Sequence, residues 1–162
     1  MQARQDARGV VYRGYRRQPF EQVIVVESED GELIGAIQHV PQHSHTGMNW
    51  GYAGAGPRDT ARSLLIDVLG SDAICPVCKG TRRVVYVAEG DGYRAEPFDP
   101  ARHPCSKRGW PCGCSGGYKH LPVGAFADQF VIHWGDEWVM SRASILAWLA
   151  RQAETHDMAA GT

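Results

Sequence analysis

The fold depends above all on one stretch of the chain, Gln22-Val-Ile-Val-Val-Glu27, followed by Ser28-Glu-Asp-Gly31 and Glu32-Leu-Ile-Gly-Ala-Ile-Gln38. Its first part is rich in β-branched residues, which favour strands. The Asp-Gly pair in the middle part suits the positive φ angles of a tight turn. The stretch therefore predicts an antiparallel hairpin, and Val10-Val-Tyr12 before it predicts a further short strand.

A helix is expected after the hairpin, from about residue 57 to residue 69. Pro57 suits its first turn and Gly70 suits its end. Apolar residues recur between them at helical spacing, namely Ala61, Leu64, Leu65, Val68 and Leu69.

The C-terminal part of the chain predicts a second hairpin and a second helix. Strands are expected over Phe126–Trp134 and Trp138–Met140, joined across Gly135-Asp-Glu137. Ser141 is a fitting helix N-cap, and the residues that mark an amphipathic helix after it are Ile145, Leu146, Trp148 and Leu149. This order of elements predicts an α+β fold, with a small, mostly antiparallel sheet and two helices.

The middle of the chain differs in composition from its flanks. Residues 71–120 hold all five cysteines and many Gly and Pro residues, and they are locally net positive. Within them, Arg82-Arg-Val-Val-Tyr-Val87 predicts a strand and Glu89-Gly-Asp-Gly92 a turn. The expected division is a disordered start at 1–9, one α+β domain at 10–70 and 121–155, an inserted zinc-knuckle or ribbon module at 71–120, and a disordered tail at 156–162.

The totals exclude several classes of protein. A chain of 162 residues fits one domain, or one domain with a small module, and a formal net charge of −1 gives no global positive field for nucleic acid. There is no run of about 18 apolar residues that would predict a membrane span, and Met1–Arg8 lacks the apolar stretch of a signal peptide. We therefore expect a cytoplasmic protein, and the reducing cytoplasm disfavours disulfides. The number of cysteines is also odd, so an all-disulfide scheme would leave one of them unpaired.

The cysteine spacing predicts a metal site. Cys75-Pro-Val-Cys78 places two thiolates in a knuckle turn where both can face one ion, and Gly80 lets backbone N–H groups turn towards sulfur. Cys112-Gly-Cys114 supplies the second pair that tetrahedral zinc needs. Zinc deaminases carry His-x-Glu upstream of such a pair, and this chain does not, so we expect a closed structural Zn²⁺ site.

The ligand set has alternatives. Cys105, His103 or His120 is near enough in sequence to replace one of the four cysteines, and Cys105 beside His103 is also a candidate reactive thiolate. The plainer interpretation is that reduced cysteines pack as small hydrophobic residues. The Cys-Pro-x-Cys-x-Gly start resembles the cysteine-rich module of DnaJ-type chaperones over only a few residues, and chaperone activity is not carried over.

A glycine-rich turn, Asn49-Trp-Gly-Tyr-Ala-Gly-Ala-Gly-Pro57, precedes the first predicted helix. Small residues at a helix N-terminus expose backbone N–H groups beside the positive end of the helix dipole, which attracts anions. The phosphate-loop lysine and the third glycine of the dinucleotide fingerprint are missing. The competing interpretation is a tight chain reversal beneath two packed aromatic side chains. The candidate ligand-binding residues are Trp50, Tyr52, Gly54, Gly56, Arg58 and Arg62.

The same turn resembles the motif of a small uncharacterised domain family of bacteria and their phages, roughly Trp-Gly-Tyr-x-Gly-x-Gly-Pro before an Ala/Leu-rich helix. The helix ending Leu65-Ile-Asp-Val-Leu-Gly70 and the segment Phe130–Leu149 are similar to the rest of that pattern. The resemblance covers residues 10–70 and 121–150 and implies that the cysteine segment is an insert. It also implies a phage or mobile-element accessory context, without an activity to transfer.

Two further clusters are weaker candidates. His39, His43 and His45 could bind a metal or act in acid–base chemistry, although such loops are more often solvated. The cysteine segment also carries residues that resemble a basic and aromatic face for phosphates and bases, or that form an ordinary solvated surface; they are Arg82, Arg83, Lys107, Arg108 and Lys119, with Trp110 and Tyr118.

From these patterns we expect a non-enzymatic, zinc-containing binding protein. Its ligand would be a nucleotide-like anion, for example a sequestered signalling nucleotide, or nucleic acid. The alternatives are a protein–protein inhibitor or adaptor that docks through the zinc module, a nucleic-acid-binding regulator, and a metal-dependent enzyme. The enzyme requires an open coordination position, and the regulator predicts affinity that falls steeply with salt.

Overall fold

The computed structural model describes residues 9–18, 21–104, 106 and 108–160. The chain divides into two compact units. The sheet unit comprises Met1–Gly70 and Pro122–Thr162, and the cysteine unit comprises Ser71–Leu121. The predicted start at 1–9 lies outside the described residues except for Gly9.

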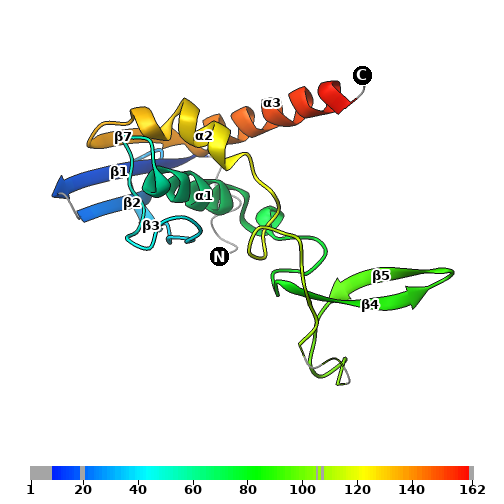
Figure 1. Ribbon diagram of the computed structural model, residues 1–162. Coiled ribbons are helices and arrows are strands. Elements are labelled where there is room, and N and C mark those ends of the chain that lie inside the picture. The colour runs from blue at the N-terminus through cyan, green and yellow to red at the C-terminus, as the bar shows by residue number, and fades with distance from the viewer. Residues whose placement is uncertain (1–8, 19–20, 105, 107, 161–162) are drawn as a thin grey trace. The chain divides into compact units, whose positions relative to one another are not determined.

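The sheet unit contains one four-stranded antiparallel sheet, in the order β3-β2-β1-β7 (Figure 1). Its strands are β1 (Val10–Gln18), β2 (Glu21–Ser28), β3 (Leu33–Ala36) and β7 (Glu137–Ser141). The predicted hairpin is confirmed, because the Gly31 N–H donates to the Ser28 carbonyl at 3.0 Å and Gly31 has φ +84°. Strand β1 is longer than its apolar start predicts, because it pairs along its length with β2 and over Val11–Tyr15 with β7.

One face of this sheet carries the core. Val10 and Tyr12 are buried, as are Ile24 and Val26 on the neighbouring strand. These residues alternate with exposed or half-buried ones such as Val23, as expected for a sheet with one covered face. The alternation fixes the register of the strands, because a shift by one residue would turn the core side chains to solvent.

Three helices pack beside the sheet (Figure 1). They are α1 (Ala55–Leu69), α2 (Val123–Gln129) and α3 (Arg142–Ala160). The prediction of α1 is confirmed. The predicted N-cap of α3 is also confirmed, because the Ser144 N–H donates to Ser141 Oγ at 3.1 Å. Helix α3 continues to Ala160, beyond residue 156 where a disordered tail was predicted, because its last residues include the strong helix former alanine.

The prediction of a second hairpin is wrong. Residues 126–129 belong to helix α2, and a 3₁₀ turn follows at Val131–His133. Phe126 and Phe130 lie one helical turn apart with ring centroids at 5.0 Å, and Phe126 also contacts Trp148 at 5.1 Å. An aromatic cluster at helical spacing therefore prevails over the β propensity of the segment. The fold is α+β as predicted, and the described residues form three α-helices in place of the two that were expected.

Trp138–Met140 does form a strand, but its partner is β1. Trp138 lies opposite Gly14, and a Cβ atom on Gly14 would collide with the indole ring. The close approach of this ring explains why glycine stands in the interior of a central strand.

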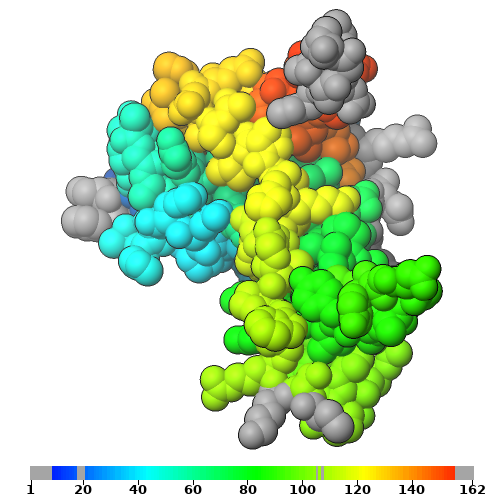
Figure 2. Space-filling model, turned by 45° about the vertical axis from the view of Figure 1, so that its right-hand side comes forward, coloured from blue at the N-terminus to red at the C-terminus, as the bar shows by residue number. Residues whose placement is uncertain are grey.

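The cysteine unit contains a three-stranded antiparallel sheet in the order β5-β4-β6. Its strands are β4 (Arg83–Glu89), β5 (Gly92–Pro97) and β6 (Trp110–Pro111). The predicted strand and the turn that follows it are confirmed, with Glu89 paired to Gly92 across the turn. Figure 2 draws this unit in green to yellow, with side chains of the β4–β5 hairpin at its surface.

Among the residues that the structure describes, no helix has both the length and the apolar character needed to cross a membrane.

Candidate functional site

The first cysteine pair lies in a tight knuckle turn before β4. The Lys79 N–H donates to the Cys75 carbonyl at 2.9 Å, and the Thr81 N–H donates to the Cys78 carbonyl at 3.0 Å. Lys79 and Gly80 both have positive φ, +49° and +86°. The left-handed backbone at these two residues turns the chain sharply, so that both sulfur atoms face the same side.

The second pair follows the short strand β6. The Cys112 N–H donates to the Arg82 carbonyl at 2.8 Å, which holds this pair against the start of β4. The Gly117 N–H donates to Cys114 Sγ at 3.2 Å. A backbone N–H directed at sulfur is the kind of contact that stabilises a thiolate.

The four sulfur atoms form a compact group, all within 4.8 Å of one another. Cys75 Sγ lies 3.9 Å from Cys112 Sγ, and Cys78 Sγ lies 3.6 Å from Cys114 Sγ. Sulfur atoms at about 2.3 Å from a tetrahedral ion would be about 3.8 Å apart, whereas a disulfide needs about 2.05 Å. The spacing therefore fits a shared metal ion.

The thiols differ in their pKa values. The backbone N–H of Cys78 lowers the pKa of Cys75 to about 7, against the effect of burial. Burial raises the pKa of Cys114 to about 12 and also raises that of Cys112. Four closely spaced thiolates are unfavourable without a cation, and a bound metal ion deprotonates thiol ligands outright.

The alternative ligands are placed elsewhere or not described. His103 Nε2 lies 2.8 Å from Glu96 Oε1, and its ring also stacks on Phe98. His120 lines the hollow at the cysteines, but its Nε2 lies 3.0 Å from the Gly113 carbonyl. Cys105 lies outside the described residues. Among the described residues, the group able to hold a metal ion consists of the four predicted cysteines.

Comparison with known proteins gives a partial match. Residues 12–81 match a family of unknown function, DUF6166. The match begins within β1 and continues through α1 to the first cysteine pair, and it agrees with the expected likeness to an uncharacterised domain. No curated protein and no solved structure matches the chain. The phage context stays a prediction.

The glycine-rich turn is built for packing around Trp50. This side chain has no exposed surface, its Nε1 donates to the Gly135 carbonyl at 2.7 Å, and its ring meets Trp138 edge-on at 5.7 Å. The ring of Trp50, one of the candidate ligand-binding residues, is therefore enclosed by the protein and not exposed to a ligand. Gly51 has φ +82°, and a Cβ atom there would lie 2.7 Å from the Trp134 carbonyl.

The other residues predicted to bind an anion are not gathered into one exposed site. Arg62 is buried and donates to Gln42 Oε1 at 2.8 Å. Gly54 and Gly56 lie under the ring of Tyr52, because Cβ atoms there would approach that side chain to 2.8 and 2.7 Å. Tyr52 and Arg58 remain exposed. The arrangement agrees with the interpretation of a tight chain reversal.

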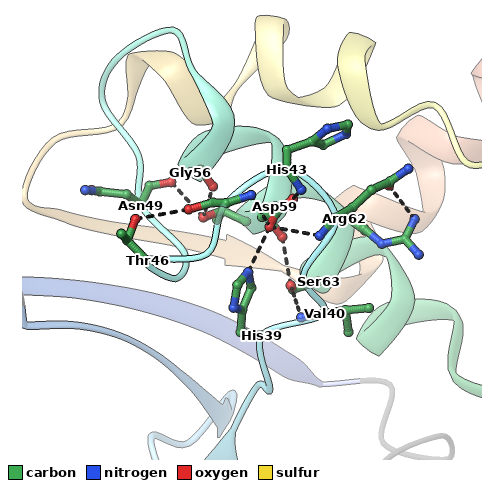
Figure 3. A network of polar contacts seen from close by, with 12 residues as sticks. His39, Val40, His43, Thr46, Asn49, Gly56, Asp59, Arg62 and Ser63 are labelled. Carbon is green, nitrogen blue, oxygen red and sulfur yellow. Dashed lines mark hydrogen bonds and ion pairs between the residues drawn. The ribbon is translucent and has the colours of Figure 1, made fainter. Parts of the chain in front are cut away.

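Asp59 is the buried charge that the sequence did not reveal (Figure 3). Its carboxylate accepts the backbone N–H groups of Gln42, His43 and Ser44 at 2.9 to 3.1 Å, and the ring of His39 lies 2.9 Å away. The contact partners precede Asp59 by 15 to 20 positions, so no local pattern indicates them. Asp59 therefore holds the loop between β3 and α1.

The three predicted histidines do not form a metal site. His39 is bound to Asp59, whereas the His43 ring points away from that carboxylate (Figure 3). His45 is exposed. None of the three belongs to a described group that could hold a metal ion.

The predicted basic and aromatic residues lie on the surface of the cysteine unit. The residues Arg82, Arg83, Arg108, Trp110 and Lys119 are exposed. Lys107 lies outside the described residues, and Tyr118 is half-buried and pairs with Ser115. Tyr86 and Tyr93, which the sequence analysis did not select, are also exposed, at 58% and 78%. The two-residue period of a strand shows which residues share a face within one strand. It does not show that Tyr86 and Tyr93 are neighbours of Trp110, because that depends on how the strands pair.

Proposed function

We propose that this chain is a non-enzymatic binding protein whose cysteine unit holds one structural Zn²⁺ ion and offers a surface to nucleic acid. The observation that carries the proposal is the set of four sulfur atoms at the spacing of a tetrahedral site. Four sulfur ligands in this geometry are typical of structural zinc. Such a set leaves no open position for water or substrate, so the ion would have no catalytic role.

The zinc ion would supply much of the stability of this unit. The apolar cluster there consists of Cys75, Cys78 and Val84, with Ala95, Cys112 and Cys114 packed against it. So small a cluster buries little apolar surface, and small modules of this kind commonly depend on a metal to fold. The surface that the unit presents would then exist only in the metal-bound protein.

The charges of the cysteine unit support a polyanionic ligand. Its ion pairs involve Arg94 and His103, which meet Glu89 and Glu96. Within the described part of the chain, six exposed cations of this unit have no acidic partner, and they are Lys79, Arg82, Arg83, Arg102, Arg108 and Lys119. Because the whole chain carries a net charge of −1, attraction to phosphates would be local to this surface.

A nucleotide-like anion at the glycine-rich turn has less support. Of the six candidate residues, Trp50, Gly56 and Arg62 are buried, and the carboxylate of Asp59 adds a negative charge within the same helix. We therefore favour nucleic acid at the cysteine unit over a sequestered nucleotide.

The test combines metal content with binding. The full chain, purified with and without a chelator, is titrated into a labelled oligonucleotide at several salt concentrations. We expect one zinc ion per chain, and affinity that falls with salt with a slope of about four to five, if each of the six cations without acidic partners contacts one phosphate. Loss of binding on chelation and recovery with zinc would support the proposal. A zinc-loaded protein that binds no oligonucleotide would overturn it in favour of a protein partner.

A further inference from the structure

Three large aromatic side chains lie on one face of the β5-β4-β6 sheet. Strand pairing places Trp110 opposite Val84, and Tyr93 opposite Ala88. Val84, Tyr86 and Ala88 alternate along β4 and therefore share a face. Because directly opposed residues lie on the same side of an antiparallel pair, Trp110, Tyr86 and Tyr93 belong to that face too. We call these three residues the aromatic face.

The aromatic face has no role in the core. The exposed fractions are 58% for Tyr86, 78% for Tyr93 and 66% for Trp110. Within the described part of the chain, none of the three rings stacks on another aromatic ring. The two tyrosine hydroxyls and the indole N–H of Trp110 make no hydrogen bond with described residues. Large aromatic side chains that are exposed together and unpartnered usually mark a binding surface.

The opposite face of the same sheet differs from the aromatic face in chemistry, because it carries the acidic side chains of β4 and β5. Val85 is buried there, and its strand partner Glu96 is bound to His103. Arg94 pairs with the carboxylates of Glu89 and Glu96. The same alternation places both of these glutamates on the opposite face. The aromatic face therefore carries no acidic strand residue.

A hollow joins the aromatic face to a positive charge. It has a volume of about 410 Å³, and its lining includes Tyr86, Val84 and Ala95 from the sheet together with Cys75, Cys112 and Cys114. Lys119 and His120 also line it. The combination of an apolar wall, an exposed tyrosine and a lysine fits a planar base joined to a phosphate.

We propose that the aromatic face binds single-stranded nucleic acid by stacking unpaired bases on Tyr86, Tyr93 and Trp110 while Lys119 contacts the phosphate backbone. This inference rests on the proposed function and adds the class of nucleic acid. Base stacking on aromatic side chains tolerates any sequence, because every base has a π-face. In a duplex the bases are already stacked on each other, so duplex DNA offers phosphates to the cations and nothing to the rings.

The experiment compares single-stranded and duplex oligonucleotides of about 12 nucleotides by fluorescence anisotropy on the zinc-loaded full chain. One variant combines Tyr86→Ala, Tyr93→Ala and Trp110→Ala. The matched control keeps the rings, with Tyr86→Phe, Tyr93→Phe and Trp110→Tyr. Zinc content is measured for each protein, so that a loss of binding is interpreted only where the metal is retained.

We expect the wild-type chain to bind the single strand more tightly than the duplex. The alanine variant should lose roughly a hundredfold in affinity for the single strand, because each ring contributes about tenfold or less. The control variant should stay within about threefold, since it keeps its stacking surfaces. If the alanine variant loses zinc, Tyr93→Ala alone serves instead, because Tyr93 lies at the hairpin turn and does not line the hollow at the cysteines; a loss of roughly tenfold is then expected.

The outcomes separate this inference from the proposed function. Equal binding by the wild-type and alanine proteins, or a preference for the duplex, would overturn the aromatic face as a stacking site while nucleic-acid binding stands. No binding of either oligonucleotide by the zinc-loaded wild type would overturn the proposed function itself.

Discussion

Single residues decide how the loop before helix α1 is held. The Asp59 side chain has no exposed surface, and its carboxylate accepts the N–H groups of three successive residues. Burial by itself raises the pKa of Asp59, but the hydrogen bonds from Ser44, His39, Gln42 and His43 together outweigh it and hold the pKa below its ordinary value of 3.8. The ionised carboxylate is therefore the form that stabilises the loop.

Asp59→Asn should lower the free energy of unfolding at neutral pH by about 2–4 kcal/mol, because the amide group turns a donor towards backbone N–H groups. Because the folded-state pKa is depressed, the stabilisation is fully present above pH 3.8 and is lost as the pH falls through the folded-state pKa. Urea unfolding at pH 7 and at pH 3 measures both effects. Asp136→Asn is the control, since Asp136 is exposed in its pair with Arg16 and should change stability by less than about 1 kcal/mol. Equal effects of the two variants would contradict the role of Asp59.

Single-residue variants also test which of the five cysteines is not a zinc ligand. Cys114→Ser should lower zinc affinity by roughly a hundredfold or more, because one of the four thiolates is removed. Cys105→Ser should leave the affinity unchanged, because the four described cysteines complete a tetrahedral set without it. Competition with a chromogenic zinc chelator measures both proteins. Weakened binding in the Cys105 variant would mean that the ligand set is different.

At the scale of elements, patterns in the sequence predicted those structures that form through contacts between near neighbours in the chain. Neighbours a few residues apart form the β2–β3 hairpin, helix α1 and the knuckle turn of the first cysteine pair. The pairing of β1 with β7 joins residues more than 120 positions apart, and helix α2 depends on a contact between Phe126 and Trp148. No period in the sequence encodes such partners. The second hairpin was therefore mispredicted, and the aromatic face could be found only after strand pairing had placed its residues together.

The glycine-rich turn offers a test at the same scale. Gly51 and Gly31 have nearly equal positive φ angles, +82° and +84°. A Cβ atom at Gly51 would lie 2.7 Å from the Trp134 carbonyl, whereas nothing lies within 4 Å of one at Gly31. Gly31→Ala should cost about 1–2 kcal/mol for the backbone angle alone. Gly51→Ala should cost about 1–3 kcal/mol more, because backbone must move to admit the methyl group. Thermal unfolding compares the two, and equal losses would contradict the packing described for this turn.

For the whole molecule, the division into two units predicts unequal dependence on metal. The sheet unit buries a core that includes Trp50, Phe126 and Trp148, whereas the apolar cluster of the cysteine unit consists largely of cysteines. Stability that comes from a metal ion is lost when the ion is removed. Removal of zinc should therefore unfold one unit and leave the other folded.

Hydrogen exchange with and without a chelator tests this dependence in the intact chain. We expect strands β4 and β5 to lose protection on chelation, while β1, β2 and helix α1 keep theirs. Zinc added back should restore the protection of β4 and β5. Unchanged exchange throughout would indicate that the cysteines act only as packed hydrophobic side chains.

The central claim is that four thiolates close around one zinc ion, and X-ray absorption at the zinc edge of the purified full chain tests it most directly. The four sulfur atoms, all within 4.8 Å of one another, predict one zinc ion per chain with four sulfur neighbours at about 2.3 Å. Absence of zinc, or a first shell with nitrogen or oxygen in place of one or more sulfurs, would contradict the closed structural site and reopen the enzymatic alternative.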